Sequence, residues 1–274
     1  MILGLIIGAI IGLVLGLTGA GGSVFAVPML ILLLGLPINQ AAGIALGVVS
    51  LSALFGTISN WQSKYILWIP ALLLGLCGAV LAPIGRQLGA QLSANIVLFG
   101  FSLLAVSIAI LMWRQAARSP EQSSVVRANA GLSDQDYIEP ICRFNNSSRF
   151  NLSASCIAAL LASGIVVGIL SGLFGVGGGF LIVPTLVFVA QVSMRQAVAT
   201  SLLIITLISG AGFLSFAQNN MLDWHLLSQV GAGGLLGMLG GRLMANKIAG
   251  APLEKIFAVS LVAVTLTTLA RQLS

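Results

Sequence analysis

Charged residues are scarce in this chain of 274 residues, at 7% of the total, whereas soluble globular domains carry about 25%. Hydrophobic residues make up 58% of the chain. So few charges cannot cover the surface of a soluble fold of this size. The composition therefore predicts an integral, multi-pass membrane protein with the lipid bilayer as its surroundings.

The residues that usually carry catalysis or bind metals are also scarce. There is one histidine, and the three cysteines Cys77, Cys142 and Cys156 show no metal-ligand spacing. No Asp or Glu falls in the middle of an apolar run, so a buried carboxylate relay for protons is not visible. The net charge of +6 comes without a basic run interleaved with aromatics. We therefore expect no enzyme, no metal or other cofactor, and no nucleic-acid partner.

Glycine, in contrast, is concentrated in one stretch and its echo. The segment from Gly16 to Pro28 recurs from Gly172 to Pro184, and both matches have the same offset, 172 − 16 = 184 − 28 = 156. Each copy interrupts a long apolar run. Since glycine costs about 1 kcal/mol relative to alanine inside a helix, this density predicts broken or re-entrant helices. Paired interruptions of this kind in two halves of a chain point to a transporter binding site.

The repeat divides the chain into three parts. We predict a first membrane repeat over 1–113, a polar linker over 114–151 and a second membrane repeat over 152–274, with about eight hydrophobic segments and an all-α fold. Full spans are expected at 38–59, 66–84, 92–113, 194–217 and 253–269, because a crossing needs about 20 apolar residues. A stripe of glycines at four-residue spacing, Gly4 to Gly16, predicts close helix packing.

The orientation of the two halves depends on how each broken segment lies. If each one crosses the membrane once, the halves are parallel, and the Lys and Arg residues divide 7 to 5 between the two sides. If each is a re-entrant hairpin, the halves are inverted, and ten of the 12 basic residues share the side of the linker. Cytoplasmic loops carry the Lys and Arg excess, so we favour the inverted arrangement with a cytoplasmic linker.

The glycine motif differs from its soluble look-alikes. No Gly-Lys-Ser/Thr follows it, as a phosphate-binding loop requires, and its glycine spacing does not fit a dinucleotide fingerprint. The half-helices that begin near Ser23 and Gly179 would instead direct free N–H groups and a positive dipole end at the break, which favours an anion. The alternative is that the glycines serve only tight helix crossing. Arg86 and Arg242 also recur at one place in the repeat, where we favour an orienting role at a helix end over attraction of anions.

The candidate anion-binding residues are the glycines of both breaks and the uncharged polar residues near them. The glutamines at 40 and 196 are of interest because the duplication preserves them. The full set is Thr18, Gly19, Gly21, Gly22, Ser23, Gln40, Gly175, Gly177, Gly178, Gly179, Gln196, Thr200 and Ser201.

The doubled pattern Gly-x-x-x-Gly-x-x-Gly-x-Gly-Gly, with a proline six residues later, runs from Gly12 and again from Gly168. It resembles the TauE/SafE-type sulfite exporter family, also called the 4-toluene sulfonate uptake permeases. The resemblance covers nearly the whole chain outside the linker, and Ser23 departs from the second copy, which has Gly179. It implies a transporter in the bacterial inner membrane for small sulfur-containing oxyanions such as sulfite or organosulfonates.

For the mechanism we expect alternating access around a central site. An anion channel and a non-transporting membrane scaffold subunit are the alternatives. Neither the direction of transport, the coupling nor the oligomeric state follows from these patterns.

Overall fold

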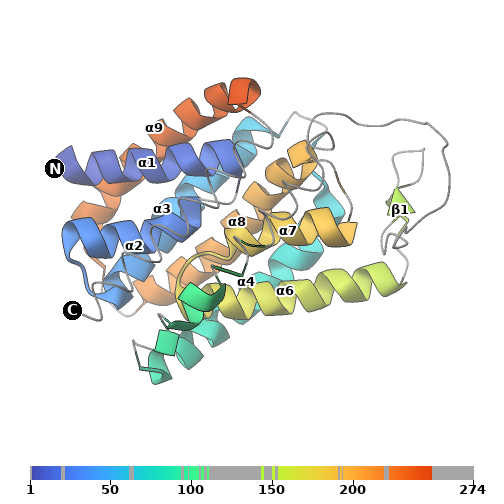
Figure 1. The fold of residues 1–274 in the computed structure, drawn as a ribbon, viewed down its shortest axis with the longest axis horizontal. Coiled ribbons are helices and arrows are strands. Elements are labelled where there is room, and N and C mark those ends of the chain that lie inside the picture. Colours follow the sequence, from blue (N-terminus) through green and yellow to red (C-terminus); the bar gives the residue numbers. More distant parts are fainter. Residues whose placement is uncertain are drawn as a thin grey trace.

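Helices form almost all of the described part of the chain in this computed structural model (Figure 1). The described residues are 2–19, 22–61, 65–93, 96–97, 99–104, 106–107, 110, 143–144, 150–151, 154–190, 192, 194–218 and 222–248. The first repeat contains α1 (Ile2–Thr18), α2 (Gly22–Leu34), α3 (Ile38–Ser59) and α4 (Trp68–Gln91). The second contains α6 (Ala154–Phe174), α7 (Gly179–Ala190), α8 (Met194–Ala217) and α9 (Trp224–Ile248).

The expected all-α membrane fold is confirmed. The only sheet in the described residues is a short antiparallel pair, β1 (Arg143–Phe144) and β2 (Phe150–Asn151), within the predicted linker. Four of the described helices, α3, α4, α6 and α8, are long and apolar enough to cross a membrane. The span expected at 38–59 coincides with α3, and the one at 194–217 with α8. The span expected at 92–113 is described only in pieces between 92 and 110, and those pieces are helical from residue 96 onward. The span expected at 253–269 lies wholly outside the described residues.

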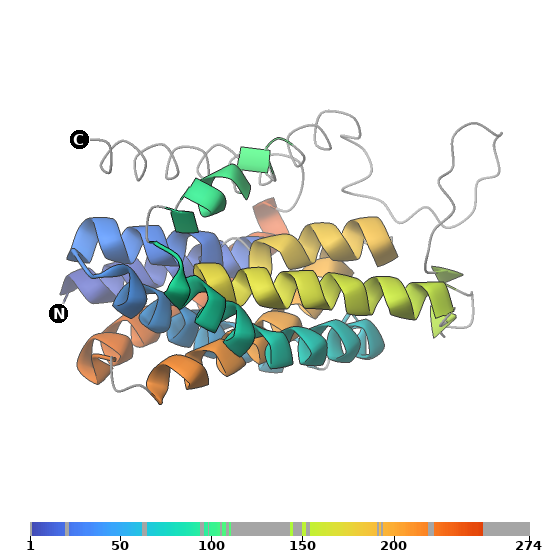
Figure 2. The same cartoon turned by 90° about the horizontal axis from the view of Figure 1, so that it is seen from below.

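The two repeats are inverted relative to each other. Corresponding helices run in opposite directions in both views, with α1 opposed to α6 and α3 opposed to α8 (Figures 1 and 2). Ser50 of α3 donates a hydrogen bond from Oγ to the carbonyl oxygen of Thr206 in α8, at 3.4 Å. These two residues occupy the same place in the repeat, since 206 − 50 = 156. A residue can contact its own counterpart only near the pseudo-two-fold axis, so this axis passes between α3 and α8.

The first helix of each repeat packs against the last described helix of the other repeat. Helix α1 packs along α9, and α6 packs along α4. A Cβ on Gly12 would meet the backbone of Gly234 in α9, and a Cβ on Gly172 would meet the backbone of Ala82 in α4. Both pairs recur at the repeat offset of 156. The counterpart of the Gly12–Gly234 pair is the contact of Gly168 with Gly78, and the counterpart of the Gly172–Ala82 pair is the contact of Gly16 with Met238. The glycine stripe therefore serves close helix packing, as predicted.

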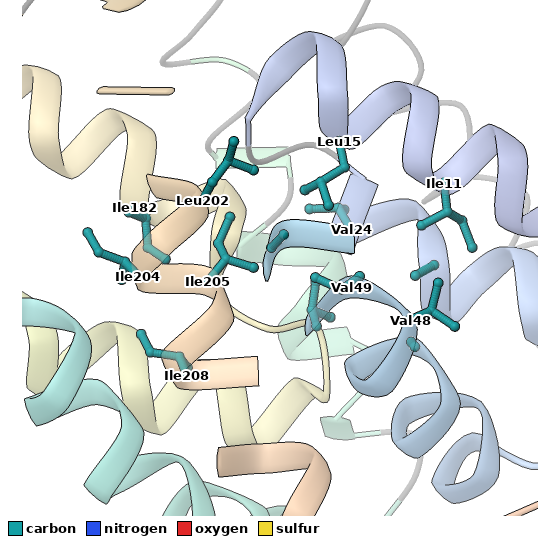
Figure 3. Packing of buried hydrophobic residues seen from close by; sticks show 14 of the residues in the cluster. Ile11, Leu15, Val24, Val48, Val49, Ile182, Leu202, Ile204, Ile205 and Ile208 are labelled. Atoms are coloured by element: carbon teal, nitrogen blue, oxygen red, sulfur yellow. The ribbon is translucent and has the colours of Figure 1, made fainter. Parts of the chain in front are cut away.

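The centre of the bundle is apolar and is built from both halves. Figure 3 shows side chains of α1 and α2, such as Leu15 and Val24, beside Val48 and Val49 of α3 and the isoleucines of α8. Lipid chains are as apolar as these side chains, so close packing rather than transfer from water holds such a core together.

The glycines of α9 allow a matched test of this packing. Gly237 has the backbone of Ala9 against it, whereas Gly240, one turn later, has nothing within 4 Å of where its Cβ would lie. We expect Gly237→Ala to lower stability by about 1–3 kcal/mol, as overpacking does. Gly240→Ala should be neutral or stabilising by up to about 1 kcal/mol. Thermal unfolding of the two purified variants in detergent measures the difference. Equal melting temperatures would contradict the α1–α9 contact.

Candidate functional site

The first glycine break joins α1 to α2. Helix α1 ends at Thr18, and Gly19 follows with a φ of 69°. The Gly19 amide donates to the carbonyl oxygen of Leu15 at 2.7 Å, which closes the last turn of α1. Ala20 and the predicted site residue Gly21 lie outside the described residues, and α2 begins at Gly22. The chain thus leaves one helix and enters the next within a few residues.

The second break, between α6 and α7, is described over its whole length. Gly175, Gly177 and Gly178 all have positive φ, at 65°, 74° and 66°. Only glycine adopts this backbone conformation without strain. The whole loop from Gly175 to Gly179 is buried. The amides of Leu181 and Ile182 donate to the carbonyl oxygen of Gly178, so α7 begins directly after the loop.

Each break rests on the third helix of the other repeat. A Cβ on Gly19 would meet Val198 of α8, and a Cβ on Gly175 would meet Ala42 of α3. These contacts are again related by the repeat, since 198 − 42 = 156. The structure therefore brings the predicted residues of α8 to the first break, and the start of α3 to the second break.

The two half-helices start close together and extend in opposite directions. Helices α2 and α7 are in contact and lie nearly in line in Figure 2. The N-terminus of a helix carries about half a positive charge from its unpaired N–H groups. The six acidic residues of the chain all lie outside the two breaks and the helices that surround them, apart from Asp223 at the start of α9. Among the described residues, two positive helix ends thus share a buried region, and the one described carboxylate, Asp223, caps α9.

Arg86 and Arg242 hold the helix ends of the opposite repeat. Nε of Arg86 in α4 donates to Oγ of Ser215 in α8 at 2.8 Å, and its guanidinium lies 5.1 Å from the centre of the Phe216 ring. Arg242 in α9 donates to the carbonyl oxygen of Ser59, the last residue of α3, at 2.8 Å. Ser59 and Ser215 are themselves repeat counterparts. This agrees with the orienting role that we favour for both arginines.

The predicted hydroxyl groups at the first break all bond within the protein. Thr18 donates from Oγ1 to the carbonyl oxygen of Val14 at 2.8 Å. Oγ of Ser201 lies 2.9 Å from the carbonyl oxygen of Gly19, which links α8 to the break. Oγ1 of Thr200 accepts a hydrogen bond from the Leu67 amide at 3.1 Å and so stabilises the start of α4. Ser23 is fully buried and has an interaction of its own.

The two glutamines lie in the first turns of the helices on which the breaks rest, each as the third residue. Gln40 lies two residues before Ala42 in α3, and Gln196 lies two residues before Val198 in α8. Both are partly buried. Gln40 is therefore near the second break rather than the first, and Gln196 is near the first rather than the second. This exchange follows from the inverted packing, which the order of residues along the chain does not reveal.

Two buried serines at the second break were not predicted. Ser171 and Ser209 are 1% and 0% exposed, and neither hydroxyl oxygen has a hydrogen-bond partner. Such a group costs about 1–3 kcal/mol when it is left unsatisfied. Ser171 could have been found, because it lies inside the glycine motif, directly before Gly172. Ser209 lies 32 residues beyond Gly177, and no sequence signal joins the two. A third such serine, Ser52 of α3, faces Gly234 in α9 instead.

Metal binding has no support in the described residues, which contain no group of three or more His, Cys, Asp or Glu residues suited to it. The side chain of Asp223 caps α9 by accepting hydrogen bonds from the amides of His225 and Leu226. The ring nitrogens of His225 face the amide of Gln229. These groups stabilise a helix start and leave the glycine breaks as the candidate site.

Comparison with known proteins points to membrane transport. The sequence model of the family described as sulfite exporter TauE/SafE matches residues 4–268. A "probable membrane transporter protein" of Xylella fastidiosa strain 9a5c is 28% identical over 255 residues, covering 91% of this chain and 87% of that protein. The "probable membrane transporter protein YdhB" of Bacillus subtilis is 27% identical and covers 83% of each chain. No solved structure matches.

The packing of the second break can be tested against an exposed glycine of the same conformation. Gly35 has a φ of 65°, like Gly175, but nothing lies within 4 Å of where its Cβ would be. Gly35→Ala should cost about 1–2 kcal/mol through the left-handed backbone alone. Gly175→Ala should cost about 1–3 kcal/mol more, because its methyl group would overlap Ala42. Denaturation of both variants in detergent measures the difference, and equal losses would contradict the contact between the break and α3.

Proposed function

Because the chain belongs to the sulfite exporter TauE/SafE family, and is thus a membrane transporter, we propose that it moves small sulfur-containing oxyanions, such as sulfite or organosulfonates, through a site at the two glycine breaks. The observation that carries this proposal is the pair of buried half-helix N-termini that meet near the middle of the bundle. Their combined positive ends favour an anion between or beside them. The backbone amides of the breaks then bind the oxygens of the anion.

Alternating access is the mechanism that the inverted repeats favour. In such transporters one arrangement of the two repeats opens the site to one side, and the exchanged arrangement opens it to the other. Here each break rests on the third helix of the opposite repeat. A small shift of α3 and α8 relative to the tightly packed α1–α9 and α4–α6 pairs would therefore change the access to both breaks together.

We place the protein in the inner membrane with its linker in the cytoplasm. In the inverted arrangement the side of the linker collects ten of the 12 basic residues, which are Lys64, Arg114, Arg118, Arg127, Arg143, Arg149, Arg195, Arg242, Lys247 and Lys255. Arg86 and Arg271 remain opposite. The excess matches the cytoplasmic side. One feature opposes this, because Cys156 in the first turn of α6 is disulfide-bonded, and disulfides are rare in the cytosol.

Flux measurements test the anion site. The purified protein is reconstituted in liposomes, and uptake of radiolabelled sulfite and sulfate is followed as a function of concentration. We expect saturable flux that Gly177→Leu abolishes, because the leucine would strain a φ of 74° and displace Ser209. Gly240→Leu is the control, since nothing lies within 4 Å of the Cβ position there. Full flux in both Gly177→Leu and Gly21→Leu would exclude the proposed site. Flux that rises without saturation would favour a channel. Absence of flux in the wild-type protein, when the protein still folds and inserts with the break glycines replaced by leucine, would favour a scaffold.

Labelling of single cysteines tests the orientation. In a background without the native cysteines, Ser123→Cys places a thiol in the linker and Gln91→Cys places one at the exposed end of α4. We expect a membrane-impermeant maleimide to label the Gln91→Cys protein in spheroplasts, in which the outer membrane has been removed. It should label the Ser123→Cys protein only after the inner membrane is permeabilised. The opposite pattern would place the linker outside and would agree with the disulfide at Cys156.

A further inference from the structure

We propose that the oxyanion binds at the second break alone, where the hydroxyl groups of Ser171 and Ser209 and the free amides at the start of α7 hold it. This inference rests on the proposed function and adds the binding groups and the stoichiometry of one anion per chain. It does not follow from the sequence repeat, which by itself treats the two breaks as equivalent.

The hydroxyl of Ser209 is turned toward the loop of the second break. From the position of a Cβ on Gly177, the Oγ of Ser209 is its nearest contact, and the Cβ of Ser209 lies farther away at 3.5 Å. Ser171 reaches the same loop from α6, with its Cβ 3.0 Å from the Cβ position of Gly178. Both hydroxyl oxygens are buried without a hydrogen-bond partner. Two unused donors thus belong to residues that contact adjacent positions of one loop, directly before a helix N-terminus whose first amides have no partner inside the helix.

The first break has hydroxyl groups too, but they are occupied. Thr18 bonds to Val14, Ser201 bonds to Gly19, and Ser23 has an interaction within the protein. An anion at the first break would therefore have to compete with bonds that hold the break in place. At the second break it would satisfy hydroxyl groups that otherwise have no partner.

The repeat shows that the two breaks have diverged in a complementary way. At an offset of 156, Ser171 and Ser209 correspond to Leu15 and Ala53, so the first break lacks the two free hydroxyl groups. Conversely, Thr18, Ser23 and Ser201 correspond to Phe174, Gly179 and Ala45, so the second break lacks the three occupied ones. One copy therefore has a structural set of hydroxyl groups, and the other has a set available to a ligand.

The chemistry of the second break fits an oxyanion with at least two acceptor oxygens. All its donors are uncharged hydroxyl and amide groups, so they bind the anion through hydrogen bonds and take up no proton from it. In this structure the loop is packed against Ser209, so the anion enters only when α8 separates from the loop. Relative movement of the two repeats in alternating access would supply that separation.

Calorimetric titration of the purified full-length protein in detergent tests the proposal, with sulfite, sulfate and benzenesulfonate as probes. We expect one site per chain for the best-bound probe. Ser171→Ala combined with Ser209→Ala should weaken binding at least about tenfold, because each hydroxyl group bonds to a charged ligand. The saturable liposome flux of the same probe should require a correspondingly higher concentration.

Two controls separate a binding role from a structural one. Ser52→Ala removes a buried hydroxyl group that is equally unpartnered but faces Gly234, and it should leave the affinity unchanged. Ser201→Ala at the first break should lower the melting temperature, because its hydroxyl group no longer bonds to the carbonyl oxygens of Gly19 and Val198. The Ser171 and Ser209 variants should show the reverse, with an unchanged or higher melting temperature and weaker binding.

The outcomes are distinct. Two equivalent anions per chain, or an unchanged affinity in the double variant, would overturn the single site while leaving the transport function in place. An equal loss in Ser52→Ala would overturn it as well. If the wild-type protein neither bound nor transported any of the three anions, the proposed function would fail, and this inference with it.

Discussion

The direct contact of helix backbones across the two repeats is the constraint on which the rest of this structure depends. Glycines and alanines on α1 and α6 let them lie against α9 and α4 without side chains between them. Because each repeat contributes its first helix to the other, neither half can form its complete packing alone. This exchange fixes the inverted arrangement and places both breaks on helices of the opposite repeat.

The arginines strengthen the same exchange at the ends of the bundle. Arg86 reaches Ser215 of α8, and Arg242 reaches the last carbonyl group of α3. A cation near the C-terminus of a helix is favourable because the carbonyl groups there carry a partial negative charge. The third helices are thus held at their C-terminal ends by arginines, whereas their starting turns contact the glycine loops. Movement of α3 or α8 would therefore change both its arginine contact and its contact with a glycine loop.

The two buried breaks differ in how they satisfy their buried hydroxyl groups. Unpaired hydroxyl groups are costly to bury, yet the second break buries those of Ser171 and Ser209 without a protein partner. At the first break the corresponding demand is met by bonds from Thr18 and Ser201. A duplicated motif has thus kept a glycine of positive φ at the end of the preceding helix in both copies, Gly19 and Gly175, while the polar groups around it serve packing in one copy and remain available in the other.

The sequence by itself determined the membrane setting, the duplication and the two glycine breaks, because composition, hydropathy and the 156-residue offset are local or periodic properties. It also indicated the packing role of the Gly4–Gly16 stripe. Only the tertiary structure decided that Gln40 lies by the second break and Gln196 by the first, that Thr200 serves the start of α4, and that Ser209 meets Gly177. These contacts join residues of different helices, and they depend on which helix of one repeat packs against which helix of the other. That choice is made by the fit of whole helix surfaces, which no single stretch of sequence contains.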